Sequence, residues 1–243
     1  RSIDLVYFLG PYSLWKDTKL CNYIFTLHDL CHRDMMEFPE VRIHNEFERR
    51  EVDYGNGMKK AIAIIVDSEI SKASAIKKYG LDNERISVLP FLPCTAIRIS
   101  DEEYDRNYID IAKKYNLNRP YIFYPAQFWS HKNHIYILEG IKLLKDNHNL
   151  VVSVVFTGSD FGNQGYIKRK TKEFELSEQI HFLGHVPNSD LVYLYKQALA
   201  LVMVTYFGPT NLPPLEAFFL KVPVIHSNLP IFQEQIQGRT LQV

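Results

Sequence analysis

Short apolar runs alternate with amphipathic stretches along this sequence, and that alternation constrains the fold more than any other feature. The apolar runs have the length of β-strands, and the stretches between them have the length and periodicity of helices. Strands and helices in such alternation are typical of βα units built around a parallel sheet. The sequence therefore predicts an α/β protein.

The first part of the chain, residues 1–95, predicts a domain of βα units. A helix is expected over Glu69–Tyr79, because Ser68 suits an N-cap and Gly80 suits a left-handed C-terminal residue. A longer helix is expected over Glu40–Lys60. The predicted strands are Ile3–Phe8, Tyr23–Leu27, Ile62–Asp67 and Ile86–Leu89.

Residues 96–119 lack this rhythm and are expected to connect two domains, with one short helix near Asp105–Tyr115. From residue 120 to 243 the alternation is regular and predicts a doubly wound Rossmann-like domain. Val151–Phe156 is apolar on both faces, as expected of a central parallel strand. The other strands are predicted at Tyr121–Tyr124, Ile180–Leu183, Leu199–Val204 and Val222–His226, and the helices at Asn133–Asp146, Gln164–Phe174, Asn188–Ala198, Pro213–Phe219 and Pro230–Gln237.

Charge and composition exclude several classes of protein. Lys+Arg and Asp+Glu both number 28, so the basic excess typical of nucleic-acid binders is missing. The three cysteines are irregularly spaced, which indicates a reducing compartment and no disulfide framework. No apolar run is long enough to span a bilayer, and no histidine pair has metal-site spacing. The chain starts within a strand without Met and stops abruptly, so a longer parent protein is expected.

Ligands of open α/β sheets bind at the carboxyl ends of the strands, so the segments that follow the strands are the candidate site. Lys132 precedes a predicted helix, where an ammonium and free amides suit a diphosphate, although a solvated lysine is the plain alternative. Gly158 and the Gly184–Pro187 turn either admit a ligand to the backbone or simply form turns. Neither a dinucleotide fingerprint nor a P-loop is present.

The segment Tyr206–Ala217 is the most informative. A Gly-Pro turn and a proline-initiated helix present free amides to the sheet edge. Glu216 lies one turn into this otherwise apolar helix and needs a partner, because an unpaired buried carboxylate is costly. Vicinal ribose hydroxyls or a structural ion pair would both serve.

These motifs, in this order, resemble retaining glycosyltransferase family four (glycosyl transferases group 1), which has the GT-B fold of two Rossmann-like domains. The likeness rests on Gly208–Glu216 followed by Val222–Asn228 and Glu234, and extends to Phe182–Val186 and Lys132–His134. In the first part, Phe25–Leu30 and Val66–Glu69 are similar to acceptor-domain segments. The resemblance implies that residues 1–95 are a partial Rossmann-like domain and that residues 120–243 bind a nucleotide sugar.

The resemblance also implies roles for individual residues. Glu216 would hold the ribose hydroxyls, and Lys132 would bind the donor diphosphate. Amides around Thr210, Asn211 and Leu212 would contact the diphosphate and the sugar. Gly184 and Val186 would line the base pocket, Gln127 would take a donor-binding position, and His28 would be the catalytic residue facing the donor sugar.

Two positions depart from the family pattern. Gly208 stands where the family has its first signature glutamate, and Gln127 stands where it has an arginine. The expected reaction is metal-independent, uses no cofactor, and moves a sugar with retention from a GDP- or UDP-sugar to a saccharide or lipid-linked saccharide. Such an enzyme would be a cytoplasmic hexosyltransferase of cell-surface polysaccharide synthesis, placed at the inner face of the membrane. The alternatives are a catalytically silent nucleotide-sugar-binding partner and a GT-B epimerase or phosphorylase.

Overall fold

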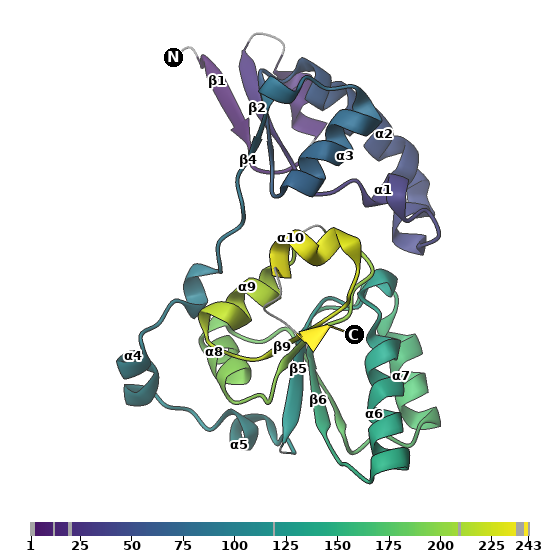
Figure 1. Cartoon of the computed structure of the whole chain (residues 1–243), viewed down its shortest axis with the longest axis vertical. Helices are drawn as coiled ribbons and strands as arrows, with labels where there is room; N and C mark the ends of the chain where they lie inside the picture. Colours follow the sequence, from purple (N-terminus) through teal and green to yellow (C-terminus); the bar gives the residue numbers. More distant parts are fainter. Residues whose placement is uncertain are drawn as a thin grey trace. The chain divides into compact units, whose positions relative to one another are not determined.

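The structure is a computed structural model that describes residues 3–11, 13–18, 21–118, 120–208, 210–236 and 241–242. The chain forms two compact units (Figure 1). Unit 1 contains residues 1–91 together with 207–210 and 230–236. Unit 2 contains residues 92–206, 211–229 and 237–243.

Unit 1 is a parallel sheet of four strands in the order β1-β2-β3-β4. Large side chains of the strands, such as Phe25, Leu27 and Ile64, are fully buried against Tyr54 and Met58 of the second helix. The strands are β1 (Leu5–Phe8), β2 (Asn22–Leu27), β3 (Ala63–Val66) and β4 (Ile86–Val88), and the helices are α1 (Cys31–Asp34), α2 (Glu46–Lys60) and α3 (Glu69–Tyr79).

Helix α3 has the predicted bounds and the predicted caps. The Ser68 hydroxyl accepts a hydrogen bond from the Ser71 amide at 3.1 Å. Gly80 ends the helix with φ 62°, in the left-handed region that glycine enters without steric cost. The Glu234 carboxylate also accepts from the amides of Glu69 and Ile70, at 2.8 and 3.1 Å. The first turn of α3 is therefore capped twice.

Helix α2 starts later than the sequence predicts. Two 3₁₀ helices, η2 (Pro39–Val41) and η3 (Ile43–Asn45), precede it, and His44 has φ 57°. This left-handed residue interrupts the helical backbone, so the predicted start at Glu40 is wrong. The helix continues through Gly57, where an added Cβ would lie 2.7 Å from the Phe25 ring. Close packing of the helix on the sheet explains that glycine.

Residues 96–119 are not an isolated connection, because Ile97, Ile111 and Leu117 pack in the core of unit 2. The stretch holds two short helices, α4 (Asp101–Arg106) and α5 (Ile111–Tyr115), in place of the single predicted one. Each has its own N-cap, since Ser100 and Asp110 accept from the amides of Glu103 and Lys113. The sequence prediction overlooked these two caps.

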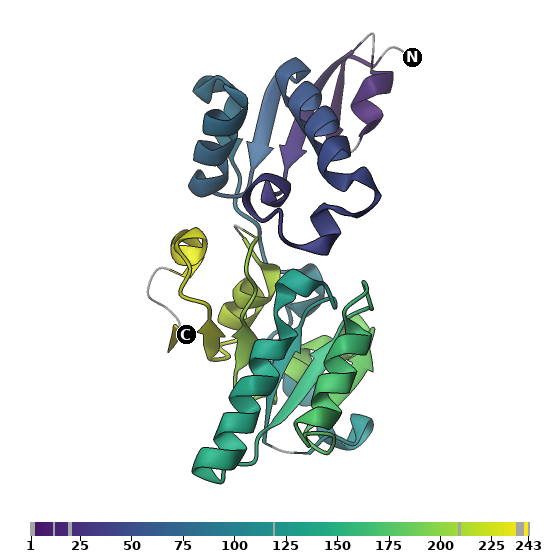
Figure 2. The same ribbon diagram turned by 90° about the vertical axis from the view of Figure 1, so that its right-hand side faces the viewer.

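Unit 2 is a parallel sheet in the order β10-β9-β8-β5-β6-β7, with helices on both faces (Figure 2). Helices α6 and α7 contribute to the core on one face, and α5, α8 and α9 contribute to the core on the other. The strands are β5 (Tyr121–Pro125), β6 (Ser153–Thr157), β7 (Ile180–Gly184), β8 (Leu201–Met203), β9 (Val224–His226) and β10 (Leu241–Gln242), and the helices are α6 (His134–His148), α7 (Gln164–Glu173), α8 (Asn188–Lys196) and α9 (Leu212–Phe219). Helix α10 (Gln233–Ile236) belongs to unit 1.

The predicted elements of unit 2 are confirmed in type and order. Strand β6 is an interior strand and all its residues are buried. It starts at Ser153, two residues later than predicted, and Val151 is 64% exposed. Strand β10 was not predicted. The predicted helix Pro230–Gln237 is a 3₁₀ helix, η7 (Pro230–Phe232), followed by α10, and Gln237 itself lies outside the described residues. The remaining 3₁₀ helices are η1 (Ser13–Asp17), η4 (Asn83–Arg85), η5 (Thr95–Ile97) and η6 (Ser130–Lys132).

Candidate functional site

The strand order of unit 2 places a topological switch point beside β5. Strand β5 pairs with β6 on one side and with β8 on the other, and the chain winds in opposite directions from there. The loops that leave β5 and β8 therefore diverge at the carboxyl edge, which is where doubly wound sheets bind nucleotides. The β5 loop carries Lys132, and the β8 loop leads into α9.

Lys132 and the start of α9 are in direct contact. The Lys132 Nζ donates to Asn211 Oδ1 at 3.1 Å, and Asn211 is the residue immediately before α9. The backbone of the β5 loop is fixed as well, because the His131 carbonyl accepts from the Thr205 hydroxyl at 3.2 Å and from the Tyr206 amide at 2.9 Å. A cation is thus held beside a helix N-terminus, an arrangement that favours anions.

Glu216 lies one turn further along α9 and is only 6% exposed. Its Oε2 accepts from the Tyr195 hydroxyl of α8 at 2.6 Å. Burial, followed by the charge of Glu216, raises the pKa of Tyr195, so this phenol stays a neutral donor. Glu216 Oε2 therefore accepts from a hydroxyl group, and a ribose also carries hydroxyl donors.

The loops after β5 and β6 are tied together. The Gln127 side-chain oxygen accepts from the Ser159 amide. Gly158 has φ 129°, and a Cβ there would lie 2.6 Å from the Ala126 carbonyl oxygen. Packing of the two loops accounts for this glycine. Gln127 is exposed and bridges the loops in the position where the family has an arginine.

Gly184 is the last residue of β7 and Val186 follows the strand, and the two differ in what they offer a ligand. Gly184 has φ 67°, and an added Cβ would meet nothing within 4 Å. Its carbonyl accepts from the Gly158 amide at 2.8 Å. Val186 lies in the core of unit 2 and is only 8% exposed.

The predicted site residues are divided between the two units. Gln127, Lys132, Gly184, Val186, Asn211, Leu212 and Glu216 belong to unit 2, whereas Thr210 and His28 belong to unit 1. Leu212 is the first residue of α9 and is exposed. In unit 1, burial raises the pKa of Asp67. A side-chain hydrogen bond from Thr210 is one of the contacts that lower it. His28 follows β2, and its ring lies 5.8 Å from that of Phe91.

The sequence prediction did not identify Tyr195 or two buried histidines near Lys132. Burial is the main cause that lowers the pKa of His134 to about 3, and the charges of Lys132 and His131 contribute to the same value. Burial also lowers the pKa of His226, again with a contribution from Lys132. Both rings are neutral at physiological pH, so the ammonium of Lys132 remains the charge that an anion would meet. The sequence offered only the position of each histidine as an indication of a role: His134 begins a helix and His226 ends a strand.

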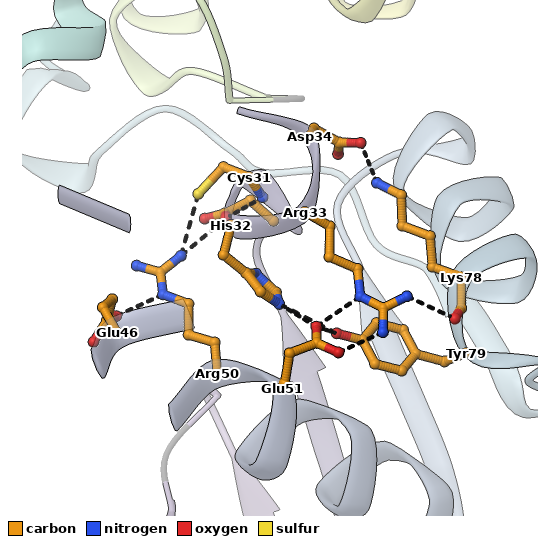
Figure 3. Close-up of polar contacts among 10 residues, drawn as sticks. Cys31, His32, Arg33, Asp34, Glu46, Arg50, Glu51, Lys78 and Tyr79 are labelled. Atoms are coloured by element: carbon orange, nitrogen blue, oxygen red, sulfur yellow. Dashed lines mark hydrogen bonds and ion pairs between the residues drawn. The ribbon is translucent and has the colours of Figure 1, made fainter. Parts of the chain in front are cut away.

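A polar network surrounds the turn after β2 in unit 1 (Figure 3). We call it the α1–α2 network, and it consists of Asp29, Cys31, His32, Arg33, Asp34, Glu46, Arg50, Glu51, Lys78 and Tyr79. Within it, Glu51 binds Arg33 through both carboxylate oxygens and accepts from Tyr79 at 2.8 Å. Arg33 is the main cause that lowers the pKa of Glu51 to about 2.

The described residues contain no group of His, Cys, Asp or Glu arranged to hold a metal ion. Among the same described residues, no helix is long and apolar enough to cross a membrane.

A doubly wound parallel sheet with helices on both faces gives unit 2 a Rossmann-like architecture. Together with the parallel sheet of unit 1, it gives the α/β architecture of the GT-B fold. A family model described as "Glycosyl transferases group 1" matches residues 105–239, more than half of the sequence. The chain belongs to this family.

Two curated relatives are bacterial mannosyltransferases. The chain is 27% identical over 224 residues to the O-antigen chain mannosyltransferase RfbU of Salmonella typhimurium, covering 92% of this chain and 57% of the relative. It is 24% identical over 234 residues to the O-antigen chain mannosyltransferase B of Escherichia coli, covering 96% and 59%. The chain therefore spans less than two thirds of the length of these relatives.

Among solved structures, the HepE protein of Anabaena in complex with UDP-glucose superposes with a TM-score of 0.72. The two sequences are 15% identical, and the match covers 93% of this chain and 60% of HepE. At this identity the likeness concerns the fold.

Proposed function

We propose that the whole protein is a glycosyltransferase that moves a sugar from a GDP- or UDP-sugar to a saccharide or lipid-linked saccharide, with retention of anomeric configuration. The contact between Lys132 and Asn211 at the start of α9 carries this proposal, because it places a cation and a helix N-terminus at the switch point of the sheet. The O-antigen mannosyltransferases among the relatives support a role in cell-surface polysaccharide synthesis. They also support a hexose as the transferred sugar. A location at the cytoplasmic face of the membrane is part of the same proposal.

The proposed chemistry depends on charge stabilisation at the leaving group. As the glycosidic bond to the diphosphate breaks, negative charge builds up on the diphosphate oxygens. The Lys132 ammonium and the amides at the start of α9, including those of Asn211 and Leu212, would stabilise that charge from fixed positions. The proposal requires no metal ion or cofactor.

Glu216 would bind the two ribose hydroxyls in this proposal. The Tyr195 hydroxyl holds one carboxylate oxygen at 2.6 Å, so the side chain is oriented before the donor arrives. Such preorganisation reduces the entropy that is lost when a ligand binds. Gly184 and the backbone of Val186 would contact the base, and Gln127 and Thr210 would complete the donor contacts.

His28 is the proposed catalytic residue on the acceptor side. It follows a parallel strand of unit 1, at the edge where an α/β sheet presents its functional groups. An imidazole there can donate a hydrogen bond to a sugar hydroxyl or accept a proton.

One observation favours a second candidate, a catalytically silent partner that binds nucleotide sugars. Gln127 uses its side-chain oxygen to bind the Ser159 amide, so it supplies no positive charge where the family has an arginine. Gly208 likewise supplies no carboxylate where the family has a glutamate.

The test uses the full-length protein, purified and mixed with GDP-mannose or UDP-glucose and with a saccharide acceptor that receives the sugar. The proposal expects a rise in melting temperature with one donor, release of its nucleoside diphosphate, and an α-linked product from an α-linked donor by NMR. Lys132→Met should abolish the thermal shift, whereas Lys142→Met, which removes an exposed pair with Asp146, should not. Donor binding without turnover would support the silent partner, and the lack of binding to any nucleotide sugar would overturn both.

A further inference from the structure

We infer that Arg50 is a positioning residue, which fixes the turn that carries His28. This inference rests on the proposed function, because it assigns Arg50 a role through the proposed catalytic histidine. No feature of the sequence pattern pointed to Arg50, which lies in the middle of α2.

The turn after β2 is short and internally hydrogen-bonded. His28 follows the last residue of the strand, and Asp29 comes next. The Asp29 Oδ1 accepts from the Cys31 amide at 3.0 Å, and the Leu30 carbonyl accepts from the Arg33 amide at 2.9 Å. Asp29 therefore sets the path of the backbone directly after His28.

Arg50 holds this turn from outside. Its Nη1 lies 3.4 Å from Asp29 Oδ1 and 3.2 Å from Cys31 Sγ (Figure 3). Burial raises the pKa of the Cys31 thiol, so Cys31 is neutral and the charge that Arg50 meets in the turn is Asp29. One guanidinium nitrogen thus binds both ends of the three-residue segment after His28.

The guanidinium is itself held in place. Arg50 Nε donates to Glu46 Oε1 at 2.6 Å, one turn earlier on α2, and the Arg50 side chain is only 19% exposed. The guanidinium is planar and rigid, so the bond from Nε to Glu46 also fixes the position of Nη1 beside Asp29. A lysine cannot bind Glu46 and Asp29 with the same fixed geometry, because its ammonium is a single point charge on a flexible stem.

Arg33 offers a matched control within the same network. It binds Glu51 through a paired contact and donates to the Lys78 carbonyl at 3.0 Å, and so joins α1 to α2 and α3. Its removal should destabilise unit 1, because it leaves Glu51 without its main partner. Its side-chain bonds go to Glu51 and to α3, so the turn after His28 should keep its shape.

The experiment compares Arg50→Met, Arg50→Lys and Arg33→Met in the full-length protein, with and without His28→Ala. The first readout is the His28 Cε1–H resonance in histidine-labelled protein, assigned by its loss in His28→Ala. Arg50→Met should shift this resonance, Arg50→Lys should shift it less, and Arg33→Met should leave it in place. Asp29→Asn, which keeps the acceptor for the Cys31 amide, replaces Arg50→Met if that variant does not fold.

The second readout is the rate of nucleoside diphosphate release from GDP-mannose or UDP-glucose. Arg50→Met should lower kcat about 10- to 100-fold, because small misplacements of a catalytic group are costly, while the donor Kd changes less than about twofold. In the His28→Ala background the same substitution should have no further effect. An equal fall in both backgrounds, or an unmoved His28 resonance, overturns the inference. If the wild-type protein releases no nucleoside diphosphate, the proposed function fails and the resonance alone decides on Arg50.

Discussion

Replacement of Glu216 by glutamine is the sharpest single test of the donor site. Glutamine keeps the shape and an oxygen that can accept from the Tyr195 hydroxyl, so the fold of α9 should survive. The substitution removes the negative charge of the side chain. Hydrogen bonds to charged groups contribute about 1.5–3 kcal/mol, roughly twice as much as bonds between neutral groups.

If the Glu216 carboxylate binds the two ribose hydroxyls, loss of its charge should weaken donor binding by about 1.5–3 kcal/mol, or about 10- to 150-fold in Kd. Isothermal titration with UDP, GDP and the two donor sugars would measure this change. Tyr195→Phe should weaken binding about tenfold or less, because it removes only the group that orients the carboxylate. Glu173→Gln, at an exposed pair with Lys170, is the control with no expected effect.

An unchanged Kd in Glu216→Gln, with an unchanged melting temperature, would contradict the ribose assignment. Glu216 would then be a structural partner of Tyr195 alone. A fall in melting temperature without a change in Kd would point to the same conclusion.

The remaining predictions concern electrostatics and packing. Lys132→Met should raise the pKa of His226, because the nearby ammonium lowers it, and an NMR titration with no change would contradict this placement of Lys132. Gly158→Ala should destabilise the protein by about 1–3 kcal/mol or more in chemical denaturation, because φ is 129° and the added Cβ would meet Ala126. Gly80→Ala is the control: the space around Gly80 is open, so the substitution should destabilise the protein by only about 1–2 kcal/mol. The pKa of Glu51 is lowered from 4.5 to about 2, so its contribution to the stability of the fold is full above pH 4.5 and is lost as the pH falls towards 2. The melting temperature of Glu51→Gln should therefore vary less over this pH range than that of the wild-type protein. Identical pH profiles of the two proteins would disprove the last of these.

Periodicity and capping residues were enough to predict the order of the longer helices and of the strands β1 to β9. Ser68 and Gly80 located both ends of α3, since local hydrogen bonds and backbone conformation decide those ends. The start of α2 could not be predicted in this way, because His44 takes up a left-handed conformation that its residue type does not demand. Strand β10 is too short to leave a periodic signal.

The sequence predicted which loops form the candidate site, but it did not predict the contacts between those loops. Lys132 and Glu216 were recognised from their places beside a strand end and on an apolar helix. The bond between Lys132 and Asn211, and that between Glu216 and Tyr195, join residues far apart in the sequence. Such pairs follow from the order of the strands in the sheet, which a single sequence does not reveal. The same applies to Arg50 and Asp29 in unit 1.

The pairing of β5 with β8 has a consequence for how unit 2 folds. Strand β5 pairs with β6, its neighbour in the sequence, through five residues, but with β8 only at Phe123 and Leu201. Contacts between distant parts of a chain form late, because their loop entropy must be overcome first. During synthesis β5, β6 and β7 can assemble before β8 and α9 arrive. The proposed donor site is then completed only when β8 and α9 dock, so nucleotide binding would report that this step of folding has taken place.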